Sequence, residues 1–301
     1  MTLGAEPSSA PFAMLRKELA FDRLTRVIDV GANPLLDAAP YAHLLRLGGC
    51  HVVGFEPQED AYAALIRDKG PNESYYPNAV GDGSEHMLHL YKSPGFASIF
   101  PPHPASNILA LGVNWQEVTG KVPFKTVRLD DLGEIGDVDL VKIDIQGGEA
   151  LVLENAVSVL SKAVAVITEQ RYYRLYDGEP MAAGVDKVLV EQGFVVHKFL
   201  SSNQFQLNST RRKMLSAMAT KDQLIDGDVV FIRDPAQIAG WTDPQVLHMC
   251  ILAATVFSSH SLVLYCLDEV VRRGLARRNI LDSYLATLPD ELLSKKYKEG
   301  K

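Results

Sequence analysis

Acidic side chains follow several apolar segments of the chain, where they could take part in chemistry. The segment VIDVGAN (27–33) carries Asp29 before a glycine, and HVVGFEP (51–57) contains Glu56. In an open parallel sheet the carboxyl ends of the strands border the ligand crevice. Gly31 would there let a ligand approach the backbone, while Glu56 accepts hydrogen bonds from ribose hydroxyls. The alternative is a tight turn and a solvated acid, but the pair favours a nucleoside site.

A second polar cluster interrupts the apolar segment DLVKIDIQGGE (139–149). Lys142 and Asp144 alternate along an expected buried strand and therefore share one face of the sheet. Buried charges are costly unless they are paired or lie at a polar crevice, which favours a site. A purely structural ion pair is the alternative. Two more acids, Asp82 and Glu169, also come at or just after expected strand ends.

The turn after the first strand limits the class of nucleoside ligand. Dinucleotide dehydrogenases use G-x-G-x-x-G to face a pyrophosphate with a helix N-terminus, whereas Gly31 is followed by Ala32, Asn33 and Pro34. A cofactor without phosphates would not need that motif. S-adenosylmethionine is such a cofactor, with ribose hydroxyls for Glu56 and an adenine amine for Asp82.

Apolar segments alternate with helical patterns along most of the chain, which is typical of βαβ units around a parallel sheet. Strands are expected at 26–30, 51–55, 74–80, 85–92, 139–149, 163–170, 193–199 and 228–234. The last two have no clear crossover helix between them and predict an antiparallel pair at the sheet edge. Helices are expected at 13–20, 40–47, 58–69 and 181–192. Another follows Gly148, with one apolar stripe formed by Ala150, Leu153, Val157 and Leu160.

Composition excludes several classes of protein. The 301 residues are 47% hydrophobic with a net charge of -7, which suits a large α/β domain and argues against a general nucleic-acid binder. Three cysteines fit neither a disulfide framework nor a zinc cluster and favour a reducing, cytoplasmic setting. The N-terminus lacks the pattern of a secretory signal. The apolar segment 246–267 is interrupted by His and Ser, so we expect a buried helix or a subunit contact instead of a membrane span.

Two segments lack a clear pattern. Residues 93–120 are rich in Pro and Gly, and a substrate pocket there would use Ser98, His103, Asn107 and Trp115. An ordinary surface loop explains each of these residues equally well. The segment LNSTRRKMLSAMATKDQLI (207–225), basic in its first half, is either a cap over the site or a solvated insertion, and we favour the insertion.

The motifs VIDVGAN, GFEP, NAVGD, RLDDL and LVKIDIQGGEALVLENA occur in this order. Together they resemble the FkbM family of S-adenosylmethionine-dependent methyltransferases over roughly 26–200. The resemblance implies an α/β fold of the class I methyltransferase type, a Rossmann-like, seven-stranded, mostly parallel sheet with an antiparallel edge hairpin. The expected division is a helical lead-in at 1–25, a cofactor-binding domain at 26–234 and a helical extension at 235–301.

The resemblance also implies roles for individual residues. Asp29, Gly31, Ala32 and Asn33 would form the loop at the methionine end of the cofactor, and Glu56 would hold the ribose. Gly81 and Asp82 would border the adenine. Asp144 would face the transferred methyl group. Family members commonly have a further glycine two positions after the Asn, whereas this chain has Pro34 and then Leu35 after Asn33.

Methyl transfer to a hydroxyl needs alignment and a base. Asp144 is the first candidate for the base or for orienting the acceptor, Glu169 is the second, and Lys142 would tune the local charge. Magnesium on Asp144 and Glu169 is chemically reasonable, although the sequence does not support a metal.

We therefore expect a cytoplasmic O-methyltransferase acting on a sugar or another hydroxylated natural product, with no nucleic-acid partner. Its C-terminal helices could support a homo-oligomer. The alternative is a non-catalytic binding or scaffold protein that keeps the fold, which Pro34 and the apolar segment 246–267 favour. Pro34 fixes its backbone angle and removes an amide donor, which would displace the loop.

Overall fold

The computed structural model describes residues 9–34, 38–112, 114–133 and 135–299. Leu35 and the first eight residues of the predicted lead-in lie outside this part. The chain forms two compact units. One contains residues 1–26, 38–51 and 234–301, and the other contains residues 27–37 and 52–233. The domain boundaries expected from the sequence stay a prediction.

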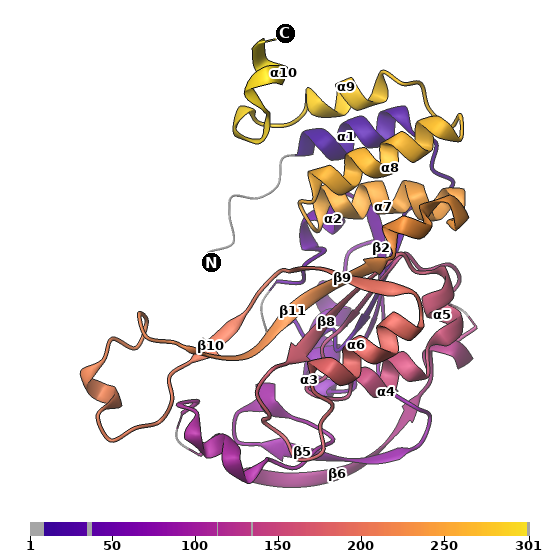
Figure 1. Cartoon of the computed structure of the whole chain (residues 1–301). Coiled ribbons are helices and arrows are strands. Elements are labelled where there is room, and N and C mark those ends of the chain that lie inside the picture. The colour runs from indigo at the N-terminus through magenta and orange to yellow at the C-terminus, as the bar shows by residue number, and fades with distance from the viewer. Residues whose placement is uncertain (1–8, 35–37, 113, 134, 300–301) are drawn as a thin grey trace. The chain divides into compact units, whose positions relative to one another are not determined.

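The central sheet contains eight strands among the described residues, in the order β10-β11-β8-β7-β1-β2-β3, with β9 also paired with β11 (Figure 1). Their bounds are β1 Thr25–Val30, β2 Cys50–Phe55, β3 Glu73–Tyr76, β7 Leu140–Ile143, β8 Ala165–Arg171, β9 Phe194–Phe199, β10 Asn203–Phe205 and β11 Gln223–Arg233. Strands β2 and β3, β1 and β7, and β7 and β8 pair in parallel. Strand β11 runs antiparallel to β8.

The outer edge of the sheet is divided between two strands. Strand β9 pairs with residues 229–233 of β11, and β10 pairs with residues 223–226. Because β8 occupies the opposite edge of β11, β9 and β10 share one position. The prediction of a mostly parallel sheet with an antiparallel edge hairpin is confirmed, with the hairpin strand broken in two.

The sheet core is apolar because its parallel strands are covered on both faces. Ile28, Val141 and Val166 come from adjacent strands, are fully buried and belong to one cluster with Leu153 and Leu189 from helices. The helices of this unit are α3 Glu59–Asp68, α4 Glu149–Glu154, α5 Val157–Lys162 and α6 Ala182–Glu191, with a short 3-10 turn at Leu129–Asp131. Helix α6 packs on β8 and β9, and α4 packs on α6 (Figure 1).

The helix predicted after Gly148 is two helices. Asn155 ends α4, and α5 begins two residues later. The break changes the direction of the following side chains, so Val157 is 56% exposed while Leu153 and Leu160 are fully buried. The prediction that Val157 belongs to the apolar stripe is therefore wrong.

A second, three-stranded sheet has the order β4-β6-β5. Its strands are β4 Ala79–Val80, β5 Glu85–Tyr91 and β6 Val118–Val127, and the 3-10 helices Pro94–Phe96 and Pro104–Ile108 lie between β5 and β6. The predicted strand 74–80 is divided by Pro77 and Asn78 between β3 and β4. Residues 118–120, expected in an irregular segment, belong to β6 instead.

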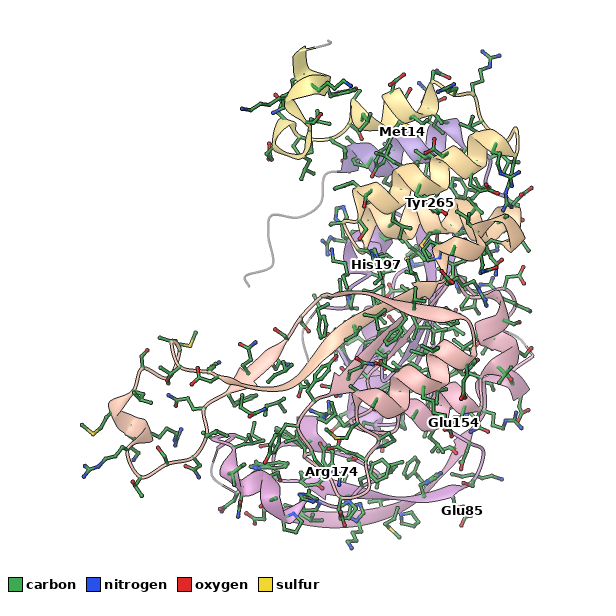
Figure 2. The ribbon with its side chains drawn as sticks, viewed as in Figure 1. Met14, Glu85, Glu154, Arg174, His197 and Tyr265 are labelled. Carbon is green, nitrogen blue, oxygen red and sulfur yellow. The ribbon has the colours of Figure 1, made fainter. Side chains whose placement is uncertain are left out.

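The other unit is helical. It contains α1 Ser9–Glu18, α2 Ala42–Arg46, α7 Asp243–Thr255, α8 His260–Arg272, α9 Ile280–Leu285 and α10 Lys295–Glu299, with 3-10 turns at Pro235–Gly240 and Asp290–Leu292. Thr242 caps α7 in a capping box with Gln245. Tyr265 lies on α8 (Figure 2). Its hydroxyl donates a hydrogen bond to the carbonyl oxygen of Pro235 at 3.0 Å.

The apolar segment 246–267 forms two helices. The chain turns between α7 and α8, where Ser258 has a φ of 48°. Ten successive residues of α7, from Val246 to Thr255, are buried. Among the described residues, no helix has the length and apolarity needed to span a bilayer. Self-association through these helices stays a prediction.

Candidate active site

The glycine turn after β1 is packed by the chain itself. The amides of Gly31 and Ala32 both donate to the carbonyl oxygen of Phe55 on β2, at 3.0 and 3.1 Å. Gly31 has a φ of 81°, and a Cβ there would lie 2.1 Å from the backbone oxygen of Asp144. The missing side chain therefore lets the ends of β1, β2 and β7 meet. Any other residue at position 31 would separate them.

Asp29 and Lys142 face each other across adjacent parallel strands. Their Cα atoms are register partners, and the ammonium of Lys142 lies 3.3 Å from the Asp29 carboxylate and 3.9 Å from that of Asp144. The same ammonium donates to the carbonyl oxygen of Gly31 at 3.3 Å. Burial alone would lower the pKa of Lys142, but Asp29 and Asp144 outweigh it and raise this pKa to about 12. Lys142 is thus a fixed cation at neutral pH.

Glu56 lies directly after β2 and is only 2% exposed. One carboxylate oxygen accepts a hydrogen bond from the amide of Gln58 at 2.8 Å, next to the start of α3. Burial raises the pKa of Glu56, and the negative charge of Asp29 adds to this, whereas the Gln58 hydrogen bond and Lys142 oppose it. Glu56 therefore shares an electrostatic environment with the β1 and β7 residues.

Gly81 and Asp82 lie at the start of the small sheet. A Cβ on Gly81 would be 2.8 Å from the Thr126 side chain. The Asp82 carboxylate accepts hydrogen bonds from Ser84 at 2.6 Å and from Thr126 at 3.2 Å, and it pairs with His86 at 2.8 Å. The hydrogen bond from Ser84, followed by that from His86, holds the pKa of Asp82 well below its ordinary value. Ser84 of the turn and Thr126 of β6 therefore hold the Asp82 carboxylate in place. The role of Asp82 toward adenine stays a prediction.

Gln146 connects the two candidate catalytic acids. It has a φ of 59°, and its side-chain amide donates to Asp144 at 3.3 Å and to Glu169 at 3.0 Å. Its amide oxygen accepts hydrogen bonds from Arg171 and from the Tyr176 hydroxyl, each at 3.2 Å. Gln146 therefore fixes the position of Asp144 relative to Glu169.

Arg171 lies among three carboxylates. Its guanidinium is 2.8 Å from Glu169 and 3.5 Å from Glu179, and it also bonds directly to Asp226. Burial raises the pKa of Glu169 well above its ordinary value; Arg171 opposes this, while the charges of Asp144 and Asp226 add to it. Burial likewise raises the pKa of Asp226. One cation therefore does not fully compensate this acidic cluster.

Glu149 belongs to the same region but has a structural role. It is buried, and its carboxylate accepts hydrogen bonds from the amides of Ile145 at 3.0 Å and of Gly147 at 2.9 and 3.1 Å. Oxygen atoms of Asp144, Glu149 and Glu169 lie within 4.8 Å of one another. The Glu149 carboxylate already accepts three hydrogen bonds from backbone amides. Only the carboxylates of Asp144 and Glu169 are therefore left for an ion that prefers six oxygen ligands. These donors do not fit magnesium well, and protein groups alone carry the chemistry proposed below.

A cavity of about 170 Å³ adjoins this cluster. Its polar wall includes Gln146, Glu169, Arg171, Asn203 and Asp226. Phe96 and Phe205 form part of its apolar wall. The cavity is smaller than the roughly 300 Å³ at which pockets for drug-sized ligands begin, so it suits one ring or a group of similar size.

The structure brings together Asp29, Lys142 and Asp144 through direct contacts, and Glu169 through Gln146. Of the residues expected to line a pocket, Ser98 donates to the backbone oxygen of Gln146 at 2.6 Å. His103 caps the 3-10 helix Pro104–Ile108. Asn107 and Trp115 line a separate cavity of about 440 Å³.

The sequence analysis missed Gln146, Arg171 and Asp226. A signal existed for Arg171, because it follows Glu169 by two residues in one strand and therefore lies on the same face of the sheet. Asp226 pairs with Arg171 across β8 and β11, and no local pattern indicates this pairing.

The chain is similar to known methyltransferases. The profile of the FkbM methyltransferase domain matches residues 29–196. The 2-O-methyltransferase NoeI from Sinorhizobium fredii (strain NBRC 101917 / NGR234) is 26% identical over 172 residues, which cover 53% of this chain and 69% of NoeI.

Solved structures of methyltransferases are also similar to this chain. Magnesium protoporphyrin IX methyltransferase (ChlM) from Synechocystis PCC 6803, with bound SAM, has a TM-score of 0.35 and 11% identity over 70% of each chain. An S-adenosylmethionine-dependent methyltransferase from Mesorhizobium loti has a TM-score of 0.35 and 11% identity over 76% of this chain and 99% of its own. These similarities are weak.

The domain match covers more than half of the chain and contains the glycine turn, Glu56, Asp144 and Glu169. The sheet order agrees with the fold that this family predicts. The chain belongs to the FkbM family and is an S-adenosylmethionine-dependent methyltransferase.

Proposed function

We propose that the protein transfers the methyl group of S-adenosylmethionine to a hydroxyl oxygen of a saccharide or another hydroxylated natural product. The main support is that Asp144 contacts both the glycine turn, where the cofactor would bind, and a residue of the cavity, where the acceptor would bind. Its backbone oxygen packs on the Gly31 turn, and its carboxylate accepts a hydrogen bond from Gln146, which lines the cavity.

The cofactor side of the proposal uses the ends of β1 and β2. Asp29, the turn 31–33 and Glu56 would bind the methionine end and the ribose, and Gly81 and Asp82 would border the adenine. The bound cofactor supplies an electrophilic methyl group on a sulfonium. The carboxylates of Asp29 and Glu56 suit a ligand with one ammonium and several hydroxyls, because both accept charge-assisted hydrogen bonds.

Asp144 is the proposed base. Its side chain is 25% exposed, compared with 13% for Glu169, so it is the more accessible of the two carboxylates. Asp144 would accept the hydroxyl proton as the acceptor oxygen receives the methyl group, with S-adenosylhomocysteine as the leaving group. Glu169 is the second candidate for this role. Lys142, whose ammonium lies 3.9 Å from the Asp144 carboxylate, would tune the local charge.

The chemistry of the cavity supports a hydroxylated acceptor. Amide and carboxylate groups of Gln146, Asn203 and Asp226 can exchange hydrogen bonds with several hydroxyls, while Phe96 and Phe205 can pack against an apolar ring face. The name of NoeI, a 2-O-methyltransferase, agrees with oxygen as the acceptor atom. Three buried free cysteines are compatible with a cytoplasmic setting.

The acceptor atom can be identified from the product. The protein would be incubated with S-adenosylmethionine carrying a ¹³C-labelled methyl group and a panel of saccharides, polyols, phenols and amines. A new methoxy carbon resonance on a saccharide or polyol is the expected result. Transfer only to nitrogen would contradict the proposed acceptor class.

A further inference from the structure

The loop between β10 and β11 is a projecting, ordered segment. It contains the 3-10 helix η4 (Arg212–Met214) and lies at the far end of the hairpin formed by β10 and β11 (Figure 1). At its base, the buried Gln206 side chain donates to the Thr220 hydroxyl at 2.6 Å. The Thr220 amide donates to the Ser216 oxygen at 3.2 Å and closes a second turn after η4. The loop therefore has a defined conformation of its own.

Large apolar side chains are exposed on these two turns. Met214 is 77% exposed, Leu215 is 58% exposed and Met218 is 80% exposed, all within five residues. Side chains of this loop extend away from the ribbon in several directions (Figure 2). Apolar groups gathered on a projecting loop are typical of an interaction site, because their exposure to water is unfavourable.

The same loop has a charge opposite to that of the whole chain. Residues 207–221 of this loop contain no acid, and Asp222 follows them directly, whereas the chain has a net charge of -7. The cations of the loop are Arg211, Arg212, Lys213 and Lys221. Three of them directly precede Met214. The loop is thus a cationic, apolar segment on an acidic protein.

We propose that the loop of residues 207–221 docks the protein on an anionic lipid surface. The cations would bind lipid phosphates, and Met214, Leu215 and Met218 would enter the boundary between headgroups and acyl chains. A nucleic acid would use the same cations but would leave three apolar side chains in water. This combination therefore favours lipid.

The position of the loop gives this docking a consequence for the site. Asn203 and Phe205 of β10 and Asp226 of β11 line the cavity next to Glu169. One hairpin thus carries both the lipid-docking loop and part of the cavity wall. An acceptor held at a membrane would reach the cavity through this hairpin.

The test is sedimentation of the full chain with vesicles of phosphatidylcholine, with and without phosphatidylglycerol. We expect binding to the mixed vesicles, weaker binding to pure phosphatidylcholine, and loss of binding as salt is raised. Neutralising Arg211 and Lys213 with glutamine should weaken binding about fivefold per charge. The combined change Met214→Ser, Leu215→Ser and Met218→Ser should weaken it by about tenfold or more.

A matched control is Val157→Ser with Val190→Ser. These residues are 56% and 58% exposed on helices of the same unit and should leave vesicle binding unchanged. Calorimetric affinity for S-adenosylmethionine should be equal in all variants, which shows that the fold is intact. Equal vesicle binding by the triple serine variant and the wild type would overturn the proposal. So would self-association or nucleic-acid binding through the loop without vesicle binding.

Discussion

The two halves of the site balance their charges differently. On the β1 side, Lys142 lies between Asp29 and Asp144, and the Gly31 turn is packed tightly against the backbone of β7. On the β8 side, Arg171 faces several carboxylates beside a cavity, and the pKa of Glu169 is raised. In the first half one cation lies between two carboxylates in a tightly packed framework, which suits a constant cofactor. The second keeps acidic groups and space, which suits a variable acceptor.

The largest effect is expected where the halves meet. Asp144→Asn should lower kcat by about 10²- to 10⁴-fold, because it removes the proposed base, and should leave affinity for S-adenosylmethionine within about twofold. Methyl-transfer kinetics and calorimetry measure the two quantities separately. Asp137→Asn, which changes an exposed acid, is the control. Equal losses of turnover and cofactor affinity would assign Asp144 to the cofactor side.

The charge imbalance of the second half predicts a large loss of stability in Arg171→Met. Removing one partner from a buried ion-pair cluster should lower the free energy of unfolding by about 3–5 kcal/mol, because the carboxylates remain buried. Urea unfolding measures it. Arg67→Met, which removes an exposed ion pair with Asp68, should change stability little. Similar stabilities for both variants would show that the cluster needs no central cation.

The first half is tested by Glu56→Ala. Loss of hydrogen bonds to a charged group should weaken affinity for S-adenosylmethionine by about 10- to 150-fold, with a smaller effect on kcat at saturating cofactor. Calorimetry measures the affinity of this variant for S-adenosylmethionine. Glu59→Ala on the adjacent helix is the control. Undiminished affinity would refute the ribose role of Glu56.

The second half should also respond to pH. Burial raises the pKa of Glu169, so the folded state binds more protons than the unfolded chain between the ordinary and the raised pKa. The free energy of unfolding should therefore fall as the pH rises through this window, and Glu169→Gln should reduce the slope. Urea unfolding between about pH 5 and about pH 8 measures the slope. An unchanged slope in the variant would show that Glu169 does not titrate there.

The smallest effect is expected at the exposed Pro34. Pro34→Ala restores an amide donor in the cofactor turn and should tighten binding of S-adenosylmethionine by about 2- to 10-fold. Calorimetry compares it with Pro40→Ala, a second proline outside the turn. Weaker binding would show that the proline's fixed backbone angle helps the turn.

The first half of the site was predictable because each of its acids follows a local apolar segment. Asp29, Glu56 and Asp144 come at or just after strand ends, and the parallel sheet brings those ends to one edge. The second half was only partly predictable. Its contacts join Gln146, strand β8 and strand β11, which are far apart in the sequence. Of these residues, only Glu169 is predicted from its place near the end of an apolar segment.

Parts of the fold escaped prediction for similar reasons. Most residues of β6 are exposed or half-buried, and Gly120 and Pro123 interrupt its alternation of apolar and polar residues. The strand therefore depends on its pairing with β5, which the local sequence does not indicate. The break between α4 and α5 is not marked by glycine or proline. Asn203 donates a hydrogen bond to Asp226, and Ser201 donates one to Asp228. The edge hairpin alone brings each donor to its carboxylate.

The most direct test of the central claim is a crystal structure of the protein with S-adenosylhomocysteine, the demethylated cofactor. We expect the ribose hydroxyls on the Glu56 carboxylate, the amino acid end beside Asp29, and the sulfur directed toward Asp144 and the cavity beside Gln146. A nucleoside bound elsewhere, or a sulfur separated from Asp144 by the chain, would contradict the two-part site.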